Sequence, residues 1–185
     1  MGLVEAGVGL IPAGGGCKEM LVRALGDLPD AIDPFPFVQQ VFMTIAMGKV
    51  SMSAEEARAM GFLRPSDGVT LNRDFLLRDA KETALGLYRA GYRRPRKRTV
   101  RLPGRSGYAT LRSALQQMRA AHQISDHDVV VGSKLAWVLC GGDVSSTARV
   151  GEQYLLDLER EAFVSLVAEP KTQERMQYML MNNKP

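Results

Sequence analysis

The sequence contains no run of about eighteen apolar residues, the length that a helix needs to cross a membrane. It also lacks the opening of a secretory leader, because its apolar residues 2–13 follow no basic stretch and are interrupted by glycine and proline. Only two cysteines are present, Cys17 and Cys140, and neither has another ligand-type residue at metal-binding spacing. These absences favour two buried thiols over a disulfide, and they predict a cytoplasmic protein without a membrane span or a metal.

Acidic residues are missing from one long stretch, residues 83–125, although the net charge of the whole chain is only +4. Its basic residues are Arg89, Arg93, Arg94, Arg96, Lys97, Arg98, Arg101, Arg105, Arg112 and Arg119. Such asymmetry predicts either an anionic partner or an internal acidic surface for the basic segment. The stretch carries no helix-turn-helix pattern and no aromatic stacking platform, so we expect no nucleic acid as partner.

Apolar residues recur at helical spacing through most of the chain, which is 45% apolar and 24% charged, as in ordinary globular proteins. We expect helices over residues 17–25, 37–47, 53–60, 72–90, 108–122, 126–140, 145–168 and 171–182. A short buried strand and turn are expected within residues 3–11, and another short strand over 99–102 in an extended basic arm, 93–107. The sequence therefore predicts a mostly α fold with a short β remnant at the N-terminus.

The glycine-rich segment Gly7–Gly16 has three interpretations. A dinucleotide-binding turn needs a third small residue where Pro12 stands, and proline has no amide to offer a pyrophosphate. A Walker A loop needs lysine followed by serine or threonine, whereas Lys18 is followed by Glu19. Both phosphate-binding interpretations therefore fail.

The third interpretation is a resemblance to the crotonase (enoyl-CoA hydratase/isomerase) superfamily. In that family a glutamate is followed, after three residues, by Gly-x-Ile-Pro-Gly-x-Gly-Gly at the start of a helix. Here Glu5 is followed at the same interval by Gly-Leu-Ile-Pro-Ala-Gly-Gly-Gly in residues 9–16. Residues 48–63 resemble a second family motif, a helix that begins Ser-Ala-Glu-Glu-Ala, and residues 161–185 resemble its C-terminal helical region. The resemblance implies the C-terminal portion of a crotonase (ClpP/crotonase-like) fold.

The wider sequence narrows this resemblance. Residues 2–20, the loop 33–37 and the arm 93–102 are similar to the C-terminal hydratase portion of bacterial bifunctional 3-hydroxyacyl-CoA dehydrogenases. In those chains a Rossmann dehydrogenase domain comes first, so the resemblance implies NAD in an N-terminal part that is absent here. It implies an enzyme of fatty-acid β-oxidation, a coenzyme A thioester as substrate, and no cofactor held by these residues. The rival hypothesis is a non-catalytic helical module for oligomer or inter-domain assembly.

The resemblance also implies a site. Glu5 matches the carboxylate that delivers a proton to the α-carbon, with a solvated strand-end carboxylate as the alternative. Gly9, Pro12, Ala13 and Gly14 would line the substrate and water site, and Ala13 stands where the family has glycine. Its methyl group would crowd the water or alter substrate preference. The second carboxylate and both oxyanion amides precede Gly2 in the family, so we expect no useful turnover from this chain alone.

The basic arm has several interpretations. In one interpretation Arg94, Arg96, Lys97 and Arg98 hold the 3′-phosphate and pyrophosphate of coenzyme A, because guanidinium groups pair well with phosphate oxygens. A solvated arm and an inter-domain contact are the alternatives. We divide the chain at residue 61, between the end of the crotonase core (1–61) and a C-terminal helical region (62–185) that carries the basic arm at 93–105. The resemblance of residues 161–185 to the family's C-terminal helical region implies a homo-oligomer.

Overall fold

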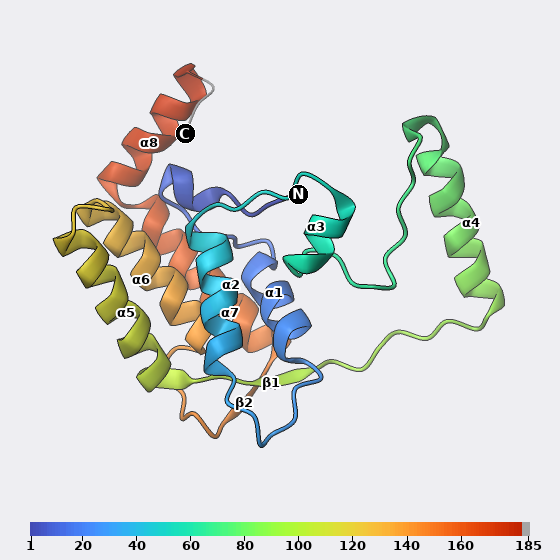
Figure 1. The fold of residues 1–185 in the computed structure, drawn as a ribbon, viewed down its shortest axis with the longest axis horizontal. Helices are drawn as coiled ribbons and strands as arrows, with labels where there is room; N and C mark the ends of the chain where they lie inside the picture. The colour runs from blue at the N-terminus through green and yellow to red at the C-terminus, as the bar shows by residue number, and fades with distance from the viewer. Residues whose placement is uncertain (183–185) are drawn as a thin grey trace.

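The computed structural model describes residues 1–182, and helices dominate this part of the chain (Figure 1). Two 3-10 turns, η1 (Glu5–Val8) and η2 (Arg73–Phe75), accompany them. The α-helices are α1 (Gly16–Leu25), α2 (Phe35–Ala46), α3 (Ala54–Ala59), α4 (Leu76–Arg89), α5 (Gly104–Ala120), α6 (Asp126–Cys140), α7 (Glu152–Val167) and α8 (Pro170–Asn182). The predicted tail ends in residues 183–185, which lie outside the described residues.

Two short strands form a small antiparallel sheet. Strand β1 (Thr99–Arg101) pairs with β2 (Arg149–Gly151), with Val100 opposite Val150. This confirms the strand predicted at 99–102. The pairing also corrects the helix predicted over 145–168, because residues 149–151 join the sheet and α7 begins only at Glu152.

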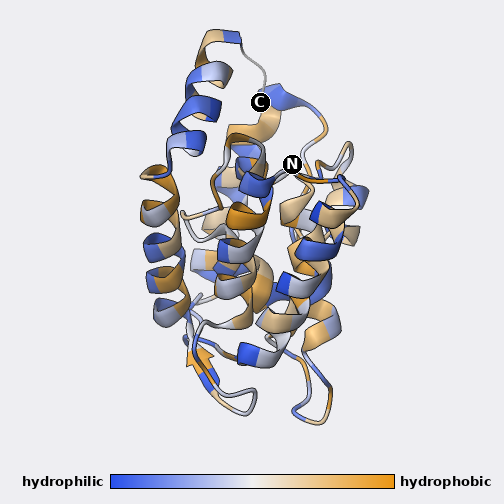
Figure 2. Cartoon of the chain, turned by 90° about the vertical axis from the view of Figure 1, so that its left-hand side faces the viewer, coloured by the Kyte–Doolittle hydropathy of each residue, from blue (hydrophilic) through white to orange (hydrophobic). Residues whose placement is uncertain are grey.

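Helix α6 lies at the centre of the packed helices and contacts α5, α2, α7 and α1. Its N-terminus is closed by a capping box, in which the Ser125 Oγ accepts from the Asp128 N–H at 3.1 Å and the Asp128 carboxylate accepts from the Ser125 N–H at 2.9 Å. Leu135 and Leu139 are at most 1% exposed. The helices carry apolar and polar residues on different faces (Figure 2), and the apolar faces meet around α6.

The core includes residues from both sides of the division expected at residue 61. Fully buried side chains come from α1 (Leu21) and α2 (Ile45) as well as from α7 (Leu155). Helix α2 begins two residues before its predicted start, because Pro36 fits the first turn of a helix, where its missing N–H costs nothing. The division at residue 61 stays a prediction.

The N-terminal segment is not the predicted strand. Gly2 forms a single antiparallel bridge with Val50, and the chain then closes on itself in η1. The Leu10 N–H bonds the Glu5 carbonyl oxygen at 3.0 Å, which leaves no extended ladder in this segment. Gly9 follows η1 with φ = 84°, a left-handed conformation that ends the turn.

Helix α4 differs from the others because none of its residues is buried. Figure 1 shows it standing apart from the other helices, on the linkers that follow α3 and precede β1. The basic arm is exposed over residues 93–99, and α5 begins at Gly104, so the extended segment is shorter than the predicted 93–107. Within the described part of the chain, no helix is both long and apolar enough to cross a membrane.

Candidate functional site

The glycine-rich turn joins η1 to α1 and lies against the C-terminal helices α7 and α8. Gly9 and Gly15 both have positive φ, 84° and 95°. A Cβ at Gly9 would lie 2.8 Å from the Thr172 Oγ1, and one at Gly16 would lie 2.7 Å from the Pro12 Cβ. The turn therefore depends on glycine both for its backbone conformation and for close packing.

The predicted site residues of the turn differ in exposure. Gly9 and Pro12 are buried, Ala13 is half-buried, and Gly14 is exposed with open space where a Cβ would be. The turn therefore brings all four together, but Ala13 and Gly14 are the ones on its accessible side. The Ala13 methyl group stands at this edge, which is where an extra methyl would meet a bound molecule.

Glu5 lies on η1 and its side chain is partly withdrawn from solvent. Its Oε2 atom is buried and has no hydrogen-bond partner in the described structure. The buried Cys17 follows the turn, and its thiol donates to the Pro12 carbonyl oxygen at 3.4 Å. Burial raises the pKa of the Cys17 thiol, and the carboxylates of Glu159 and Glu5 raise it further. Cys17 is therefore a protonated thiol. The polar atom of this segment that lacks a hydrogen-bond partner is the Oε2 of Glu5.

A second carboxylate, that of Glu159 on α7, holds the end of the turn where α1 begins. Its side chain is 0% exposed and accepts the Gly15 N–H at 2.9 Å and the Lys18 N–H. Burial raises the pKa of the Glu159 carboxyl, and the two backbone hydrogen bonds oppose that rise. Two of the amides at the start of α1 are thus bonded to an internal carboxylate.

The other end of the turn is held by a hydrogen-bond chain. The Thr172 hydroxyl donates to the Gly9 carbonyl oxygen at 2.9 Å and lies 2.9 Å from the His127 Nε2. Because a hydroxyl has one proton to give, His127 must donate from Nε2, which assigns its tautomer. His127 is 5% exposed, because Thr172 and Arg175 of α8 contact the start of α6 at this point.

The basic arm lies apart from the turn, near the end of the molecule where β1 lies (Figure 1). A cavity of about 380 Å³ is lined there by Arg94, Arg96, Lys97 and Arg98, together with Glu19 and Glu152. The Arg98 N–H donates to the Glu152 carboxylate at 2.8 Å, and its guanidinium lies 3.6 Å from Asp27. Arg98 therefore lies against acidic side chains of its own chain, which is one of the two outcomes that the charge pattern predicts.

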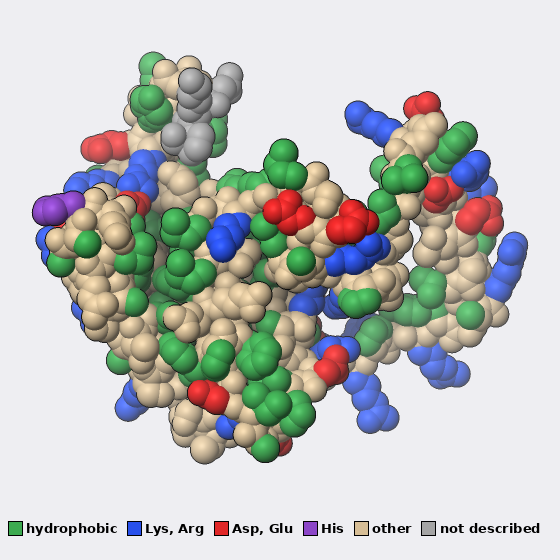
Figure 3. Space-filling view, in the orientation of Figure 1, with side chains coloured by type: hydrophobic (Ala, Val, Ile, Leu, Met, Phe, Trp, Pro, Cys, Tyr) green, Lys and Arg blue, Asp and Glu red, His purple; other side chains and the backbone are tan. Residues whose placement is uncertain are grey.

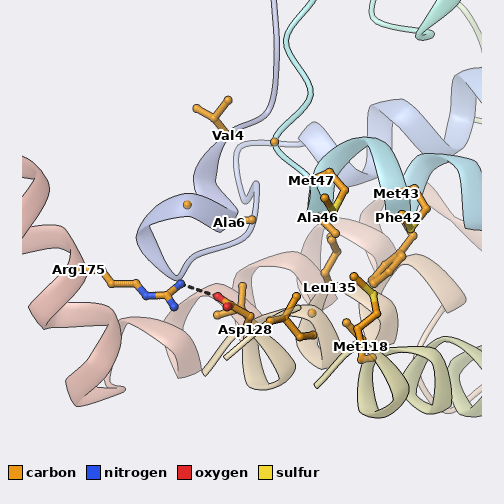
Figure 4. A pocket seen from close by; sticks show the side chains of 16 residues that line it. Val4, Ala6, Phe42, Met43, Ala46, Met47, Met118, Asp128, Leu135 and Arg175 are labelled. Carbon is orange, nitrogen blue, oxygen red and sulfur yellow. Dashed lines mark hydrogen bonds and ion pairs between the residues drawn. The ribbon is translucent and has the colours of Figure 1, made fainter. Parts of the chain in front are cut away.

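A cavity of about 680 Å³ opens between η1, α2, α5 and α6 (Figure 4). Apolar side chains gather along the hollow between α5 and α2 (Figure 3), including Phe42, Met43 and Met118. At its other side the Arg175 guanidinium bonds the Asp128 carboxylate at 2.7 Å. Val4 and Ala6, the neighbours of Glu5 in the sequence, line this cavity. The described residues include no group of three metal-ligating side chains.

Two known proteins are similar to the chain over nearly all of its length. The chain is 49% identical over 185 residues, its full length, to a probable 3-hydroxyacyl-CoA dehydrogenase of Bacillus subtilis (strain 168). It is 29% identical over 175 residues, 95% of the chain, to a putative fatty acid oxidation complex trifunctional enzyme of Rickettsia felis (strain ATCC VR-1525 / URRWXCal2). It spans only 23% and 21% of the lengths of these two relatives. No protein-family model and no solved structure matches the chain.

Proposed function

We propose that these residues belong to a cytoplasmic enzyme of fatty-acid β-oxidation and form the C-terminal part of a crotonase-type enoyl-CoA hydratase unit. The similarity to a 3-hydroxyacyl-CoA dehydrogenase and to a fatty acid oxidation enzyme supports the parent activity. The observation that carries the hydratase role is the buried, unpartnered Oε2 of Glu5, in the 3-10 turn that leads directly into the glycine-rich turn. A buried carboxylate oxygen without a partner is costly, and a bound substrate would relieve that cost.

In this proposal Glu5 gives a proton to the α-carbon of a trans-2-enoyl thioester while water adds its oxygen to the β-carbon. The double bond is lost and a 3-hydroxyacyl thioester forms, and a second carboxylate takes the proton that the attacking water releases. We assign that carboxylate, the oxyanion amides and the NAD-dependent oxidation of the product to the larger part of the relatives that this chain does not cover. Arg94, Arg96 and Lys97 would contact the phosphates of coenzyme A, since Arg98 already has two acidic partners.

The test is hydration of crotonyl-CoA by the full-length protein, followed by the loss of the conjugated thioester absorbance. Glu5→Gln keeps the side-chain volume and removes the transferable proton. General acid–base groups contribute about 10²- to 10⁴-fold, so kcat should fall by that factor. Glu161→Gln, an exposed position on α7, is the matched control and should leave kcat unchanged. Full activity of Glu5→Gln would refute the proposed role.

The exposed face of α4 favours a second candidate function, assembly with another domain or another copy of the chain. Leu77 and Tyr88 of this helix are each 82% exposed, which is unusual for the apolar side of an amphipathic helix. Light scattering of the full-length protein tests this candidate. Replacement of Leu77 and Tyr88 by Ser should lower the measured mass, whereas an unchanged mass would count against assembly through α4.

A further inference from the structure

The glycine-rich turn has no regular structure of its own, yet two C-terminal helices hold it at both ends. Glu159 of α7 accepts the Gly15 and Lys18 N–H groups, and Thr172 of α8 donates to the Gly9 carbonyl oxygen. Both side chains are 0% exposed. These contacts join residues 144, 141 and 163 positions apart in the sequence.

The position of Glu5 depends on these contacts through the backbone. Gly9 directly follows η1, and the Leu10 N–H bonds the carbonyl oxygen of Glu5 itself at 3.0 Å. A shift of the Gly9 peptide therefore moves the peptide that carries Glu5. At the other end the carboxylate of Glu159 fixes the start of α1, which carries Cys17, and the Cys17 thiol in turn donates to the Pro12 carbonyl oxygen at 3.4 Å. Both ends of the turn thus set where the Glu5 carboxylate lies.

Glu159 also determines what the N-terminus of α1 can bind. Free amides at a helix N-terminus form a site for anions, such as a phosphate or a developing oxyanion. Here the Glu159 carboxyl group accepts two of those N–H groups, and the Lys18 amine is bonded to Glu19 and Glu152. The carboxylate therefore holds the turn at a place that a substrate group does not use.

Thr172 is the centre of a directed chain of two hydrogen bonds. It accepts from His127 and donates to Gly9, so loss of its hydroxyl leaves a buried N–H and a buried carbonyl oxygen unpaired. Valine has nearly the shape of threonine without the hydroxyl, whereas serine keeps the hydroxyl. The chain therefore offers a matched pair of substitutions that separates the hydrogen bond from packing.

We propose that Glu159 and Thr172 are positioning residues that clamp the glycine-rich turn and so hold Glu5 in place for proton transfer. This inference rests on the proposed hydratase function. Neither side chain touches the reacting atoms, and both act through the backbone of the turn. A misplacement of about 1 Å at a reacting group costs up to about 10²-fold in rate. Loss of either contact should therefore lower kcat more than it changes KM.

The experiment measures kcat and KM for crotonyl-CoA with the full-length protein, at temperatures well below the melting temperature of each variant. Thr172→Val and Glu159→Gln should lower kcat by about 10- to 100-fold, with KM within about twofold of wild type. Thr172→Ser should restore most of the kcat lost in Thr172→Val. Should Glu159→Gln fail to fold, the valine and serine variants decide the question.

Two outcomes separate this inference from the proposed function. If Thr172→Val melts at a lower temperature but keeps the wild-type kcat while folded, Thr172 is only a structural residue and the clamp is refuted. In that case Glu5→Gln would still lose activity. If Glu5→Gln itself keeps the wild-type kcat, the proposed function fails, whatever Thr172 and Glu159 do.

Discussion

Helices α6 and α4 have similar lengths but opposite surroundings. Nine residues of α6 are buried, whereas none of α4 is. Leu135 of α6 is 1% exposed and Leu77 of α4 is 82% exposed. An apolar stripe therefore predicts that a segment is helical, but whether the stripe is covered depends on other parts of the chain. The candidate site belongs to the covered region, where its position can be held by packing.

The comparison is tested most strongly by the same truncation in both helices. Leu139 of α6 is fully buried, so Leu139→Ala should lower the free energy of local unfolding by about 2–5 kcal/mol. Leu77→Ala in α4 should change it by less than about 0.5 kcal/mol. Hydrogen exchange of the full-length protein, measured on peptides from α6, reports both effects. Equal losses in the two variants would show that α4 is covered by a partner.

Glycine at positive φ gives a finer test of the same contrast. Gly9 and Gly91 have φ = 84° and 72°, and a Cβ at Gly91 would meet no atom within 4 Å. Gly91→Ala should therefore cost only the backbone strain of about 1–2 kcal/mol. Gly9→Ala should cost about 2–3 kcal/mol, because its Cβ also displaces the Thr172 hydroxyl. Thermal unfolding should place Gly9→Ala below Gly91→Ala, and the reverse order would contradict the clamp.

The smallest expected effect is a pH dependence at His127. Burial lowers the pKa of this imidazole, and Arg175 lowers it further, while Glu169 and Asp128 oppose the shift. Since the folded state prefers the neutral ring, its stabilisation is complete above the ordinary value of 6.5 and is lost as the pH falls through the lower folded pKa. The protection factors of α8 amides, which are corrected for the intrinsic exchange rate at each pH, should therefore fall below pH 6.5 in wild type.

His127→Gln removes the titrating group but keeps an amide donor near Thr172. Its α8 protection factors should not fall in this way over the same pH range. His122→Gln, at an exposed position, is the control and should behave as wild type. Identical pH profiles for the His127→Gln and wild-type proteins would show that another group titrates.

Local patterns predicted most of the helices because capping and periodicity are properties of neighbouring residues. The helix expected over 53–60 forms as α3, where the Ser53 hydroxyl accepts the Glu56 N–H and the Glu56 side chain accepts the Met52 N–H. Pairing between distant segments was not predicted, and for that reason residues 149–151 were assigned to a helix. The same limit explains the N-terminal segment, where η1 replaced the expected strand.

The candidate site likewise contains some residues that the sequence identified and others that only the structure shows. The glycine-rich turn and Glu5 form a contiguous motif, so the sequence identified them as a candidate. Glu159 was missed, although it shares the apolar face of α7 with Leu155, Ala162 and Leu166 at helical spacing. A lone carboxylate on such a face is a signal that sequence analysis can use. Thr172 and His127 give no comparable signal, because only the folded chain brings them to Gly9.

The most direct test of the central claim follows the α-proton itself. The full-length protein is incubated with 3-hydroxybutyryl-CoA in D₂O without NAD, and deuterium at the α-carbon is measured by mass spectrometry. Reversible dehydration should introduce deuterium in wild type and in Glu161→Gln, and Glu5→Gln should slow this exchange by about 10²- to 10⁴-fold. Exchange at the wild-type rate in Glu5→Gln would contradict the assignment of the α-proton to Glu5.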